Sequence, residues 1–398
     1  MDGLWLEWLV FAVRWFHVIA AIAWIGASFY FIWLDQSLVA PGAEKAARGL
    51  KGELWAIHGG GIYEVGKYRL APPRMPERLH WFKWEAYTTW LSGFALLMAL
   101  YYVRADTYMI GAATWVQTPL AAIVCSLIFL TLLFLLYEGA LRTRLLAYPV
   151  ALAAVITVGA FGASVIAWQL FSPRAAALHV GAALATIMAG NVFLGIIPAQ
   201  KKLVAAIAAN VEPDPAPAEL AKLRSTHNNY LTLPVLICML SNHAPFLYAH
   251  PSANVLLPAL MVLAALGRHF FNLRNRGIYK PQWLVGSITA YVAIVILAAY
   301  ESSTAPARST PDAAPEVAPL LQAHCANCHS ARPTHPGFAS APGGLLFVDP
   351  QDLRANANGI SREQIVIALS TGYMPLGNQT QLAESDRARL IAWITQSP

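Results

Sequence analysis

Residues 117–137 read QTPLAAIVCSLIFLTLLFLLY and contain no Asp, Glu, Lys or Arg. A helix of about 20 mostly apolar residues is long enough to cross the hydrocarbon core of a bilayer. Seven further stretches have the same character: 8–34, 86–103, 147–170, 176–197, 229–249, 250–267 and 282–300. Arg14 is the only charged residue in any of them. The sequence therefore predicts an all-α fold, a polytopic membrane helical bundle of about eight spans.

The composition supports this class of fold. Hydrophobic residues make up 57% and charged residues 12% of the 398 residues, and the mean hydropathy is +0.49. Soluble domains contain about 25% charged residues, so a disordered chain, a coiled coil and an ordinary cytosolic enzyme are excluded. The net charge of +6 does not indicate nucleic-acid binding, because Lys and Arg concentrate in the connections 35–85, 138–146, 198–228 and 268–281.

The distribution of the basic residues also predicts the orientation of the chain. Short basic loops stay on the cytoplasmic side of a membrane. With eight spans, both chain termini lie on the opposite side, where the connections contain only Arg104 and Arg174. We therefore expect a multi-pass protein with cytoplasmic basic loops and both termini outside.

After the last predicted span the composition changes. Residues 301–316 read ESSTAPARSTPDAAPE and are rich in Pro, Ala and Ser, as expected for a semi-extended linker. We divide the chain accordingly into a membrane domain (1–300), a linker (301–316) and a C-terminal domain (317–398). About 80 residues support a small domain only if another group helps to fill its core.

The C-terminal domain begins with a Cys-x-x-Cys-His motif formed by Cys325, Cys328 and His329. This motif is typical of c-type haem attachment, because the two thiols can form thioethers with the haem vinyl groups and the imidazole can bind the iron. The alternatives are a thioredoxin-like redox pair and half of a zinc site. The first lacks its βαβ context, and the second lacks another Cys or His pair at metal-binding spacing.

A sixth iron ligand is expected downstream of the motif. Met374 is the predicted ligand because it lies beside Pro375 in the segment TGYMP (371–375), and His335 is the competing candidate. Residues 385–394 then predict a closing amphipathic helix. The C-terminal domain resembles a class I cytochrome c over its whole length, which implies one covalent haem c.

Three histidines fall within the outer half of the predicted spans: His17, His179 and His243. Polar residues inside a membrane are costly and are functional by default. One interpretation is that these histidines bind the iron of a b-type haem and that Arg14 holds a propionate. The alternative is that they form hydrogen bonds between helices and that Arg14 extends to the membrane surface.

The predicted cytoplasmic connections concentrate polar residues suited to a planar anion. Long loops in compact proteins are usually functional, and the loop 33–84 carries the segment LWAIHGGGIYEV (54–65), followed by basic residues. The candidate catalytic residues are His58, Glu64, His227 and Asn228, and the candidate substrate-binding residues are Lys67, Arg69, Thr226, Asn229 and Arg268. For each Lys or Arg the alternative is simple anchoring at the membrane surface.

Several segments together resemble the membrane-bound bacterial urate oxidase family, also called urate hydroxylase. They are LVFAVRWFHV (9–18) with Trp24-Ile25-Gly26, the His58-Gly-Gly-Gly loop, THNNY (226–230) and the haem-attachment tail. The resemblance covers the whole chain. It implies oxidation of urate to 5-hydroxyisourate with water as the oxygen source, electron transfer to haem c, and no hydrogen peroxide. The implied location is the bacterial inner membrane, with the cytochrome c domain in the periplasm.

No catalytic residue is carried over from the family, and the expected base is a histidine or Glu64. The expected partners are urate, the lipid bilayer and a downstream electron acceptor such as a soluble cytochrome c or a terminal oxidase. A b-type haem would bridge the hydrocarbon core of about 30 Å between cytoplasmic urate and haem c. Two other functions remain open: a quinol-oxidising membrane cytochrome, and a purine permease with a redox-regulatory tail.

Overall fold

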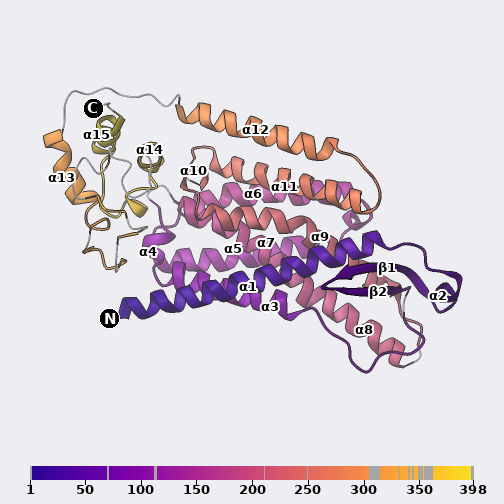
Figure 1. Cartoon of the computed structure of the whole chain (residues 1–398). Helices are drawn as coiled ribbons and strands as arrows, with labels where there is room; N and C mark the ends of the chain where they lie inside the picture. The colour runs from indigo at the N-terminus through magenta and orange to yellow at the C-terminus, as the bar shows by residue number, and fades with distance from the viewer. Residues whose placement is uncertain are drawn as a thin grey trace.

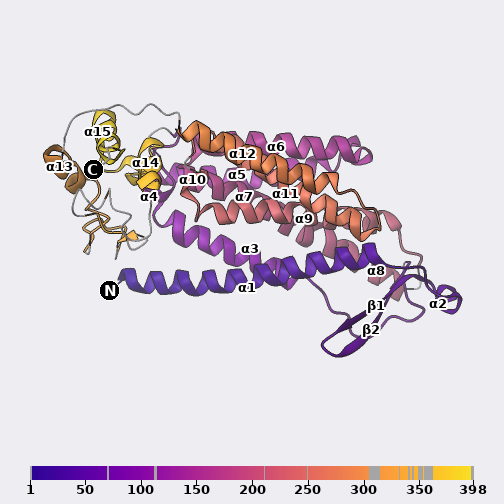
Figure 2. The same cartoon turned by 45° about the horizontal axis from the view of Figure 1, so that its top comes forward.

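The computed structural model describes residues 2–69, 71–111, 114–209, 211–248, 250–303, 314–330, 332–338, 341–342, 345–347, 353 and 362–395. Long helices that run side by side form most of the structure, and a small group of C-terminal helices lies at one end of them (Figure 1). The turned view shows the same two parts, with a β-hairpin projecting at the other end (Figure 2).

The elements follow one another in this order: α1 (Asp2–Ser37), α2 (Ala43–Ala47), β1 (Leu50–His58), β2 (Gly61–Tyr68), α3 (Trp84–Leu97), the π-helix η1 (Met98–Tyr102), α4 (Ala105–Tyr108), α5 (Pro119–Ala140), the 3-10 helix η2 (Arg144–Ala147), α6 (Pro149–Leu170), α7 (Pro173–Gly190), the π-helix η3 (Asn191–Ile196), α8 (Ile197–Ala208), α9 (Pro215–Ser241), α10 (Pro245–Tyr248), α11 (Ala253–Asn275), α12 (Gln282–Ser303), α13 (Ala314–His324), α14 (Arg362–Ser370), the 3-10 helix η7 (Leu376–Asn378) and α15 (Glu384–Thr395).

Within the described ranges, six helical segments are long and apolar enough to cross a membrane. They are Trp8–Ser37, Pro119–Ala140, Pro149–Leu170, Pro173–Ala208, Ala253–Asn275 and Gln282–Tyr300, and each overlaps one predicted span. The other two predicted spans, 86–103 and 229–249, overlap α3–η1 and the second half of α9. These helices pack against α1 and α7 in the same bundle but are not among the six. The mostly helical chain is thus compatible with a membrane protein.

The helix ends follow local sequence signals. Proline occupies the first turn of α5, α6, α7 and α9, where the backbone N–H has no helical partner and the fixed φ suits the helix. Thr118 caps α5 by accepting the N–H of Ala121, and Asp214 caps α9 by accepting the N–H of Ala216. Arg268 does not end a helix, because α11 continues through Asn275.

The outer surface of the bundle is strongly apolar. Leu120 on α5 and Val150 on α6 are 73% and 83% exposed, and α12 exposes a run of Val, Ile and Leu side chains. Apolar patches of this extent are rare on monomeric soluble proteins. The surface therefore suits a hydrocarbon environment.

Strands β1 and β2 form an antiparallel hairpin, which departs from the all-α prediction. His58 pairs with Gly61 across the turn, and Gly59 and Gly60 both have positive φ, +58° and +79°. Two central residues of positive φ match the type I′ turn that joins two-residue hairpins. Gly59 and Gly60 of the His58-Gly-Gly-Gly segment are therefore explained by the turn, and Gly61 begins β2.

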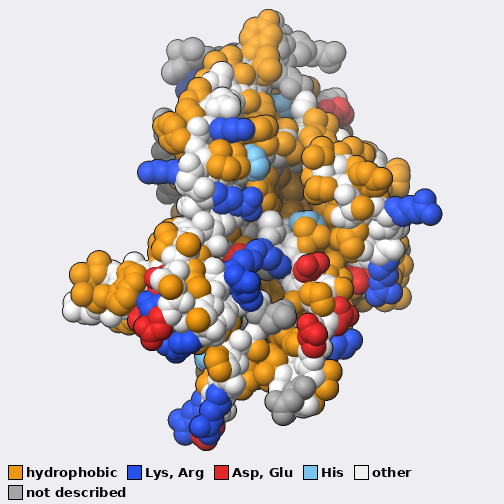
Figure 3. Space-filling model, turned by 90° about the vertical axis from the view of Figure 1, so that its right-hand side faces the viewer, with side chains coloured by type: hydrophobic (Ala, Val, Ile, Leu, Met, Phe, Trp, Pro, Cys, Tyr) orange, Lys and Arg blue, Asp and Glu red, His pale blue; other side chains and the backbone are white. Residues whose placement is uncertain are grey.

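The hairpin end of the bundle carries much of the charge. Lys67 of β2 and Lys222 of α9 both pair with Asp35 near the end of α1. Lys, Arg and His side chains border a hollow in this face (Figure 3). The opposite end holds the N-terminus of α1 and the C-terminal helices (Figure 1).

Helices α7 and α9 approach closely at Gly181. A Cβ placed there would lie 2.6 Å from the Cβ of Cys238, so we expect Gly181→Ala to lower the free energy of unfolding by about 1–3 kcal/mol through overpacking. Thermal unfolding in detergent, followed by far-UV circular dichroism, measures this change. The control is Gly159→Ala on α6, where nothing lies within 4 Å. Equal melting temperatures for the two variants would contradict the close contact.

Helices α13, α14 and α15 share an apolar core of their own, in which Val317, Leu321, Leu390 and Trp393 are buried. We call the described residues from 314 onwards the tail. The tail packs against the bundle where η7 contacts α4, and Arg104 of the bundle donates a hydrogen bond to the carbonyl oxygen of Gly337. Of the expected linker, residues 301–303 end α12 and 314–316 begin α13. Residues 304–313 lie outside the described ranges.

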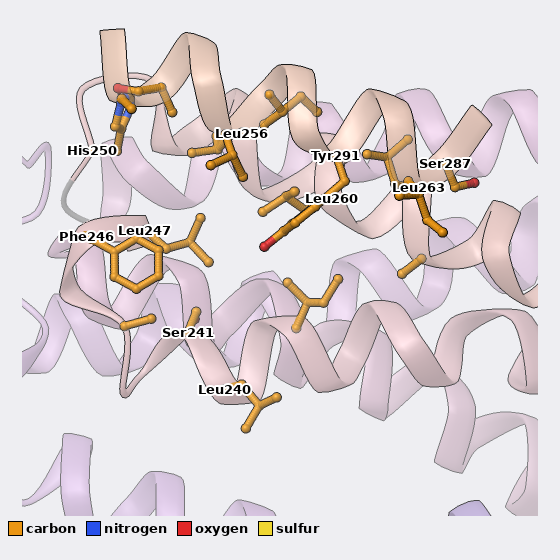
Figure 4. A pocket seen from close by; sticks show the side chains of 18 of the residues that line it. Leu240, Ser241, Phe246, Leu247, His250, Leu256, Leu260, Leu263, Ser287 and Tyr291 are labelled. Carbon is orange, nitrogen blue, oxygen red and sulfur yellow. The ribbon is translucent and has the colours of Figure 1, made fainter. Parts of the chain in front are cut away.

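A cavity of about 1200 Å³ lies between α9, α11 and α12. Its walls are mainly Leu, Ile and Val side chains, and Leu256, Leu260 and Tyr291 point into it (Figure 4). Both nitrogens of His250 at its rim are hydrogen-bonded, Nδ1 to the Ser252 N–H and Nε2 to the Ala298 carbonyl. Such a lining suits an aliphatic chain and offers few partners to a polar ligand.

Candidate functional site

The Cys-x-x-Cys-His motif follows α13 directly. His329 is mostly buried, and its Nδ1 lies 3.1 Å from the carbonyl oxygen of Leu345. Because a carbonyl only accepts, Nδ1 is the donor and Nε2 carries a free lone pair. Metal-binding histidines commonly have this arrangement. Burial raises the pKa of the Cys325 thiol to about 12 and also raises that of Cys328, so both thiols are neutral at physiological pH.

A cleft beside this motif is lined by Cys328, His329 and Met374. The loop that carries Met374 is held by the buried Arg387 of α15, which donates to the carbonyl oxygens of Met374 and Leu369. His329 and Met374 therefore border one space. The cleft thus offers Cys328, His329 and Met374, and Cys325 lies one helical turn before Cys328, so the residue types present are those that would hold a c-type haem.

His335, the competing ligand, also lines the cleft, but both of its ring nitrogens are engaged. Nδ1 accepts the N–H of Gly337 at 3.0 Å, and Nε2 lies 2.6 Å from Oε1 of Gln379. In the described part of the chain, no three His, Cys, Asp or Glu side chains gather as a metal site. Among the described residues, Cys325 and Cys328 therefore have no further side chains with which to form a zinc site.

The bundle supplies one wall of this cleft. Thr107 and Tyr108 of α4 and Arg174 of α7 line it together with the tail residues. Sequence reasoning counted Arg174 only as a charge that indicates topology. Its place at the cleft depends on how the tail meets the bundle, which no local pattern encodes.

The three candidate ligands of a b-type haem lie apart in the described structure. His17 on α1 donates from Nδ1 towards the Thr89 carbonyl and Ser92 Oγ, each 3.0 Å away. His243 is exposed, and so is Arg14. No hydrogen bond or ring contact among the described residues links His17, His179 and His243 to one another.

Both nitrogens of His179 are occupied. Nδ1 donates to the carbonyl of Ala175 at 2.7 Å, and Nε2 accepts from Ser126 Oγ at 2.7 Å. Ser126 is also hydrogen-bonded to Tyr102 OH at 2.7 Å. Iron ligation by His179 would break the bond to Ser126, so a bis-histidine haem does not fit these positions as the structure has them.

Helix α9 carries two polar clusters on different faces. The first, the charge-paired cluster, consists of Tyr137, Glu138, Asn191, Arg224, His227 and Asn228. Arg224 binds Glu138 at 2.8 Å and Asn191 Oδ1 at 2.8 Å. Asn191 Nδ2 donates to Asn228 Oδ1 at 2.9 Å, and Tyr137 OH lies 2.8 Å from His227 Nδ1. Its cation has a carboxylate partner, so the cluster is electrically balanced.

The first residue of η3 is Asn191, and π-helical turns often occur at functional sites. Gly195 in the same turn makes room for Arg224, because a Cβ there would lie 2.5 Å from Cδ of Arg224. The π-helical turn and the glycine therefore belong to the construction of the charge-paired cluster.

The second cluster, the arginine–amide cluster, consists of Phe29, Asn229, Arg268 and Asn272. Arg268 Nε and Asn272 Nδ2 both donate to Asn229 Oδ1 at 3.0 Å, and the Arg268 guanidinium lies 3.9 Å from the centroid of the Phe29 ring. The polar residues are buried, with exposures of 8% for Arg268, 0% for Asn229 and 2% for Asn272. The described part of the chain offers no carboxylate to Arg268.

Three buried polar atoms of this cluster have no partner among the described residues: Arg268 Nη2, Asn229 Nδ2 and Asn272 Oδ1. An unsatisfied buried polar group costs about 1–3 kcal/mol. The cluster therefore holds two donors and one acceptor without partners beside an unpaired positive charge.

The candidates on the hairpin lie elsewhere. His58 is exposed, Glu64 pairs with Lys45, Lys67 pairs with Asp35, and Arg69 is exposed with its backbone N–H bonded to Gly49. Thr226 donates to the carbonyl of Lys222 in its own helix. The structure thus unites Asn229 with Arg268 in one cluster and His227 with Asn228 in the other, and it leaves the hairpin residues outside both.

The residues of the two clusters that were not predicted from the sequence are Phe29, Tyr137, Glu138, Asn191, Arg224 and Asn272. One usable signal was present. Arg268 and Asn272, like Arg224 and Asn228, are four residues apart and therefore share a helix face. For Phe29, Asn191 and Glu138 no local signal exists, because their contacts depend on how three different helices are rotated.

The structure combines an apolar helical bundle that contains a buried arginine–amide cluster with a tail that carries a Cys-x-x-Cys-His cleft. The family model described as "Urate oxidase N-terminal" matches residues 3–299, which is the whole bundle, so the chain belongs to this family. At the level of the family, the protein is an oxidoreductase that acts on urate. No curated protein and no solved structure matches the chain.

Proposed function

We propose that the protein oxidises urate to 5-hydroxyisourate with water and passes the electrons to a haem c on its own tail. The balance is simple. A C–O bond forms between water and C5 of urate, two electrons leave, and two protons are released. Because these electrons go to the tail, molecular oxygen is not the acceptor and hydrogen peroxide is not formed.

The observation that carries this proposal is the arginine–amide cluster. Urate is an anion at neutral pH, and a guanidinium binds planar anions through parallel N–H groups. Arg268 Nη2 and Asn229 Nδ2 would donate to urate oxygens, and Asn272 Oδ1 would accept a ring N–H. The flat face of Arg268 against Phe29 limits the ligand to the remaining edge of the guanidinium.

Two histidine–tyrosine pairs provide proton acceptors. One pair belongs to the charge-paired cluster, and the other neighbours the arginine–amide cluster. Tyr137 is bonded to His227, and Tyr230 OH lies 2.7 Å from His269 Nδ1. Tyr230 and His269 follow Asn229 and Arg268 directly in sequence. We propose that these imidazoles take up the protons that water and urate lose.

In the tail, Cys325 and Cys328 would hold the haem covalently, and His329 and Met374 would bind its iron. When bound, this group accepts one electron at a time. The helix rise puts Arg174, at the cleft, about 26 Å along the axis of α7 from Asn191 of the charge-paired cluster, which lies on another face of α9 than the arginine–amide cluster. Aromatic side chains bridge part of this distance, since Tyr101 lies 6.3 Å from His179 and 6.1 Å from Tyr108.

We propose further that the protein lies in the inner membrane of a bacterium, with the hairpin end in the cytoplasm and the tail in the periplasm. The apolar helices and the basic residues of the hairpin end support this orientation. A soluble cytochrome c or a terminal oxidase would then reoxidise the tail from the periplasmic side.

The decisive test adds urate anaerobically to the oxidised full-length protein and follows the haem absorption. We expect reduction of the haem and formation of 5-hydroxyisourate, with oxygen derived from ¹⁸O-labelled water. An unchanged spectrum with urate, together with reduction by a quinol, would replace the proposal by a quinol-oxidising cytochrome. An unchanged spectrum with intact urate uptake into vesicles would indicate a permease. A pyridine haemochrome spectrum of the same sample counts c-type and b-type haem.

A further inference from the structure

The cleft that carries His329 and Met374 is not a property of the tail alone. Thr107, Tyr108 and Arg174 of the bundle line it together with Tyr373 and Met374 of the tail. A group that occupies the cleft therefore touches both parts of the protein. Among the residues that line this wall from the bundle, Arg174 is the charged one.

Arg174 is fixed from the side facing the bundle. Its Nε donates to Asn242 Oδ1 at 3.0 Å, and the same oxygen accepts from Tyr101 OH at 2.9 Å. The guanidinium lies over the ring of Tyr108, 5.9 Å from its centroid. These contacts engage Nε and one face of the guanidinium. The terminal nitrogens Nη1 and Nη2 bond to no acceptor in the described part of the chain.

The charge of Arg174 has no counter-ion in the described ranges. Its electrostatic neighbours are the four tyrosines Tyr101, Tyr108, Tyr248 and Tyr373. Shielding a cation from water is costly unless an anion compensates it, and a carboxylate is the anion that matches the two terminal nitrogens of a guanidinium. The arrangement is therefore incomplete without a carboxylate in the cleft.

We propose that Arg174 binds a propionate of the porphyrin attached to Cys325 and Cys328, an inference that rests on the haem c of the proposed function. The bundle, and not the tail, then supplies the counter-charge. Two consequences follow. The porphyrin is fixed in orientation relative to α7, and the positive charge beside it favours the reduced form, because reduction adds one negative charge to the group.

Redox titration of the full-length, haem-loaded protein tests this role. We expect Arg174→Gln to shift the equilibrium between oxidised and reduced haem on the order of tenfold towards the oxidised form. For one electron this shift lowers the midpoint potential by about 59 mV. Arg174→Lys keeps the charge but loses the paired geometry, so its fall is smaller. The control is Arg332→Gln, which removes an exposed charge of the tail that does not line the cleft.

A midpoint for Arg174→Gln equal to that of Arg332→Gln would overturn the inference. If Arg174→Gln does not accumulate, Asn242→Ala is titrated instead. It removes the partner of Nε and keeps the charge, so a smaller fall is expected and an unchanged midpoint refutes the assignment. The proposed function fails separately: a haem that urate does not reduce, but whose potential depends on Arg174, refutes urate oxidation and leaves this inference standing.

Discussion

Arg268→Gln is expected to lower kcat/KM for urate by about 10²–10³-fold, the largest effect of any single substitution in the bundle. Hydrogen bonds to charged groups contribute about 1.5–3 kcal/mol each, and this change removes both the charge and the paired N–H groups. Arg268→Lys should recover little of the loss, since an ammonium is a point charge without the planar fork. The measurement is urate-dependent reduction of the haem under anaerobic conditions.

The matched control is Arg274→Gln, an exposed arginine of the same helix. It should leave kcat/KM within about twofold of wild type, because exposed charges are screened by solvent. The haem spectrum and the melting temperature of Arg268→Gln separate a lost binding group from a misfolded bundle. Wild-type turnover by a folded Arg268→Gln protein would remove the arginine–amide cluster from the mechanism.

The second large effect is expected in the tail. The double variant Cys325→Ala/Cys328→Ala should lose all covalently bound haem and all urate-dependent electron transfer, because both thioether bonds are gone. Haem staining of a denaturing gel and the intact mass of the chain measure the covalent group. Urate binding to the bundle, measured by calorimetry, should persist, since the arginine–amide cluster lies near the opposite end.

The bundle offers a control for this variant as well. Cys125 of α5 and Cys238 of α9 are free thiols outside the tail, and Cys125→Ala should retain the full haem stain. A double tail variant that still carries covalent haem would show that the attachment site lies elsewhere. Loss of urate binding in that variant would show that the bundle requires the tail in order to fold.

The helical character of the chain could be predicted from sequence because hydrophobic length is a local property. Residues 117–137 and 147–170 recur as α5 and α6 with shifts of a few residues. The ends were less certain, since Arg268 looked like a boundary but is buried inside α11 against Phe29 and Asn229. From sequence alone, a charged residue after an apolar run indicates the end of a membrane span. The partners that allow such a residue to be buried inside the helix become visible only in the structure.

The hairpin shows a different limit. Two glycines between short alternating segments were a usable turn signal, yet the same glycines also suit a ligand-binding loop. Strand pairing between Leu54 and Val65 decides in favour of the turn. Such pairing is a contact between two segments, so the local sequence does not reveal it. The interpretation of His58 as part of a pocket depended on the loop alternative.

The candidate site was predicted in part. Arg268 and Asn229 were both named from sequence because they flank apolar runs, and the structure joins them by a hydrogen bond of 3.0 Å. Their shared cluster could not be derived, because the rotation of α9 relative to α11 decides which of Asn228 and Asn229 faces Arg268. The same rotation places Asn228 with Arg224 and Asn191.

The division of the cleft beside His329 and Met374, the proposed porphyrin site, between two parts of the chain constrains protein engineering. A tail grafted onto a foreign anchor would keep Cys325, Cys328, His329 and Met374 but lose the surface formed by Thr107, Tyr108 and Arg174. A chimera that is to preserve redox behaviour must therefore transplant α4 and the first turn of α7 along with residues 317–398. For the same reason, the two parts are expected to covary as a unit when homologous chains diverge.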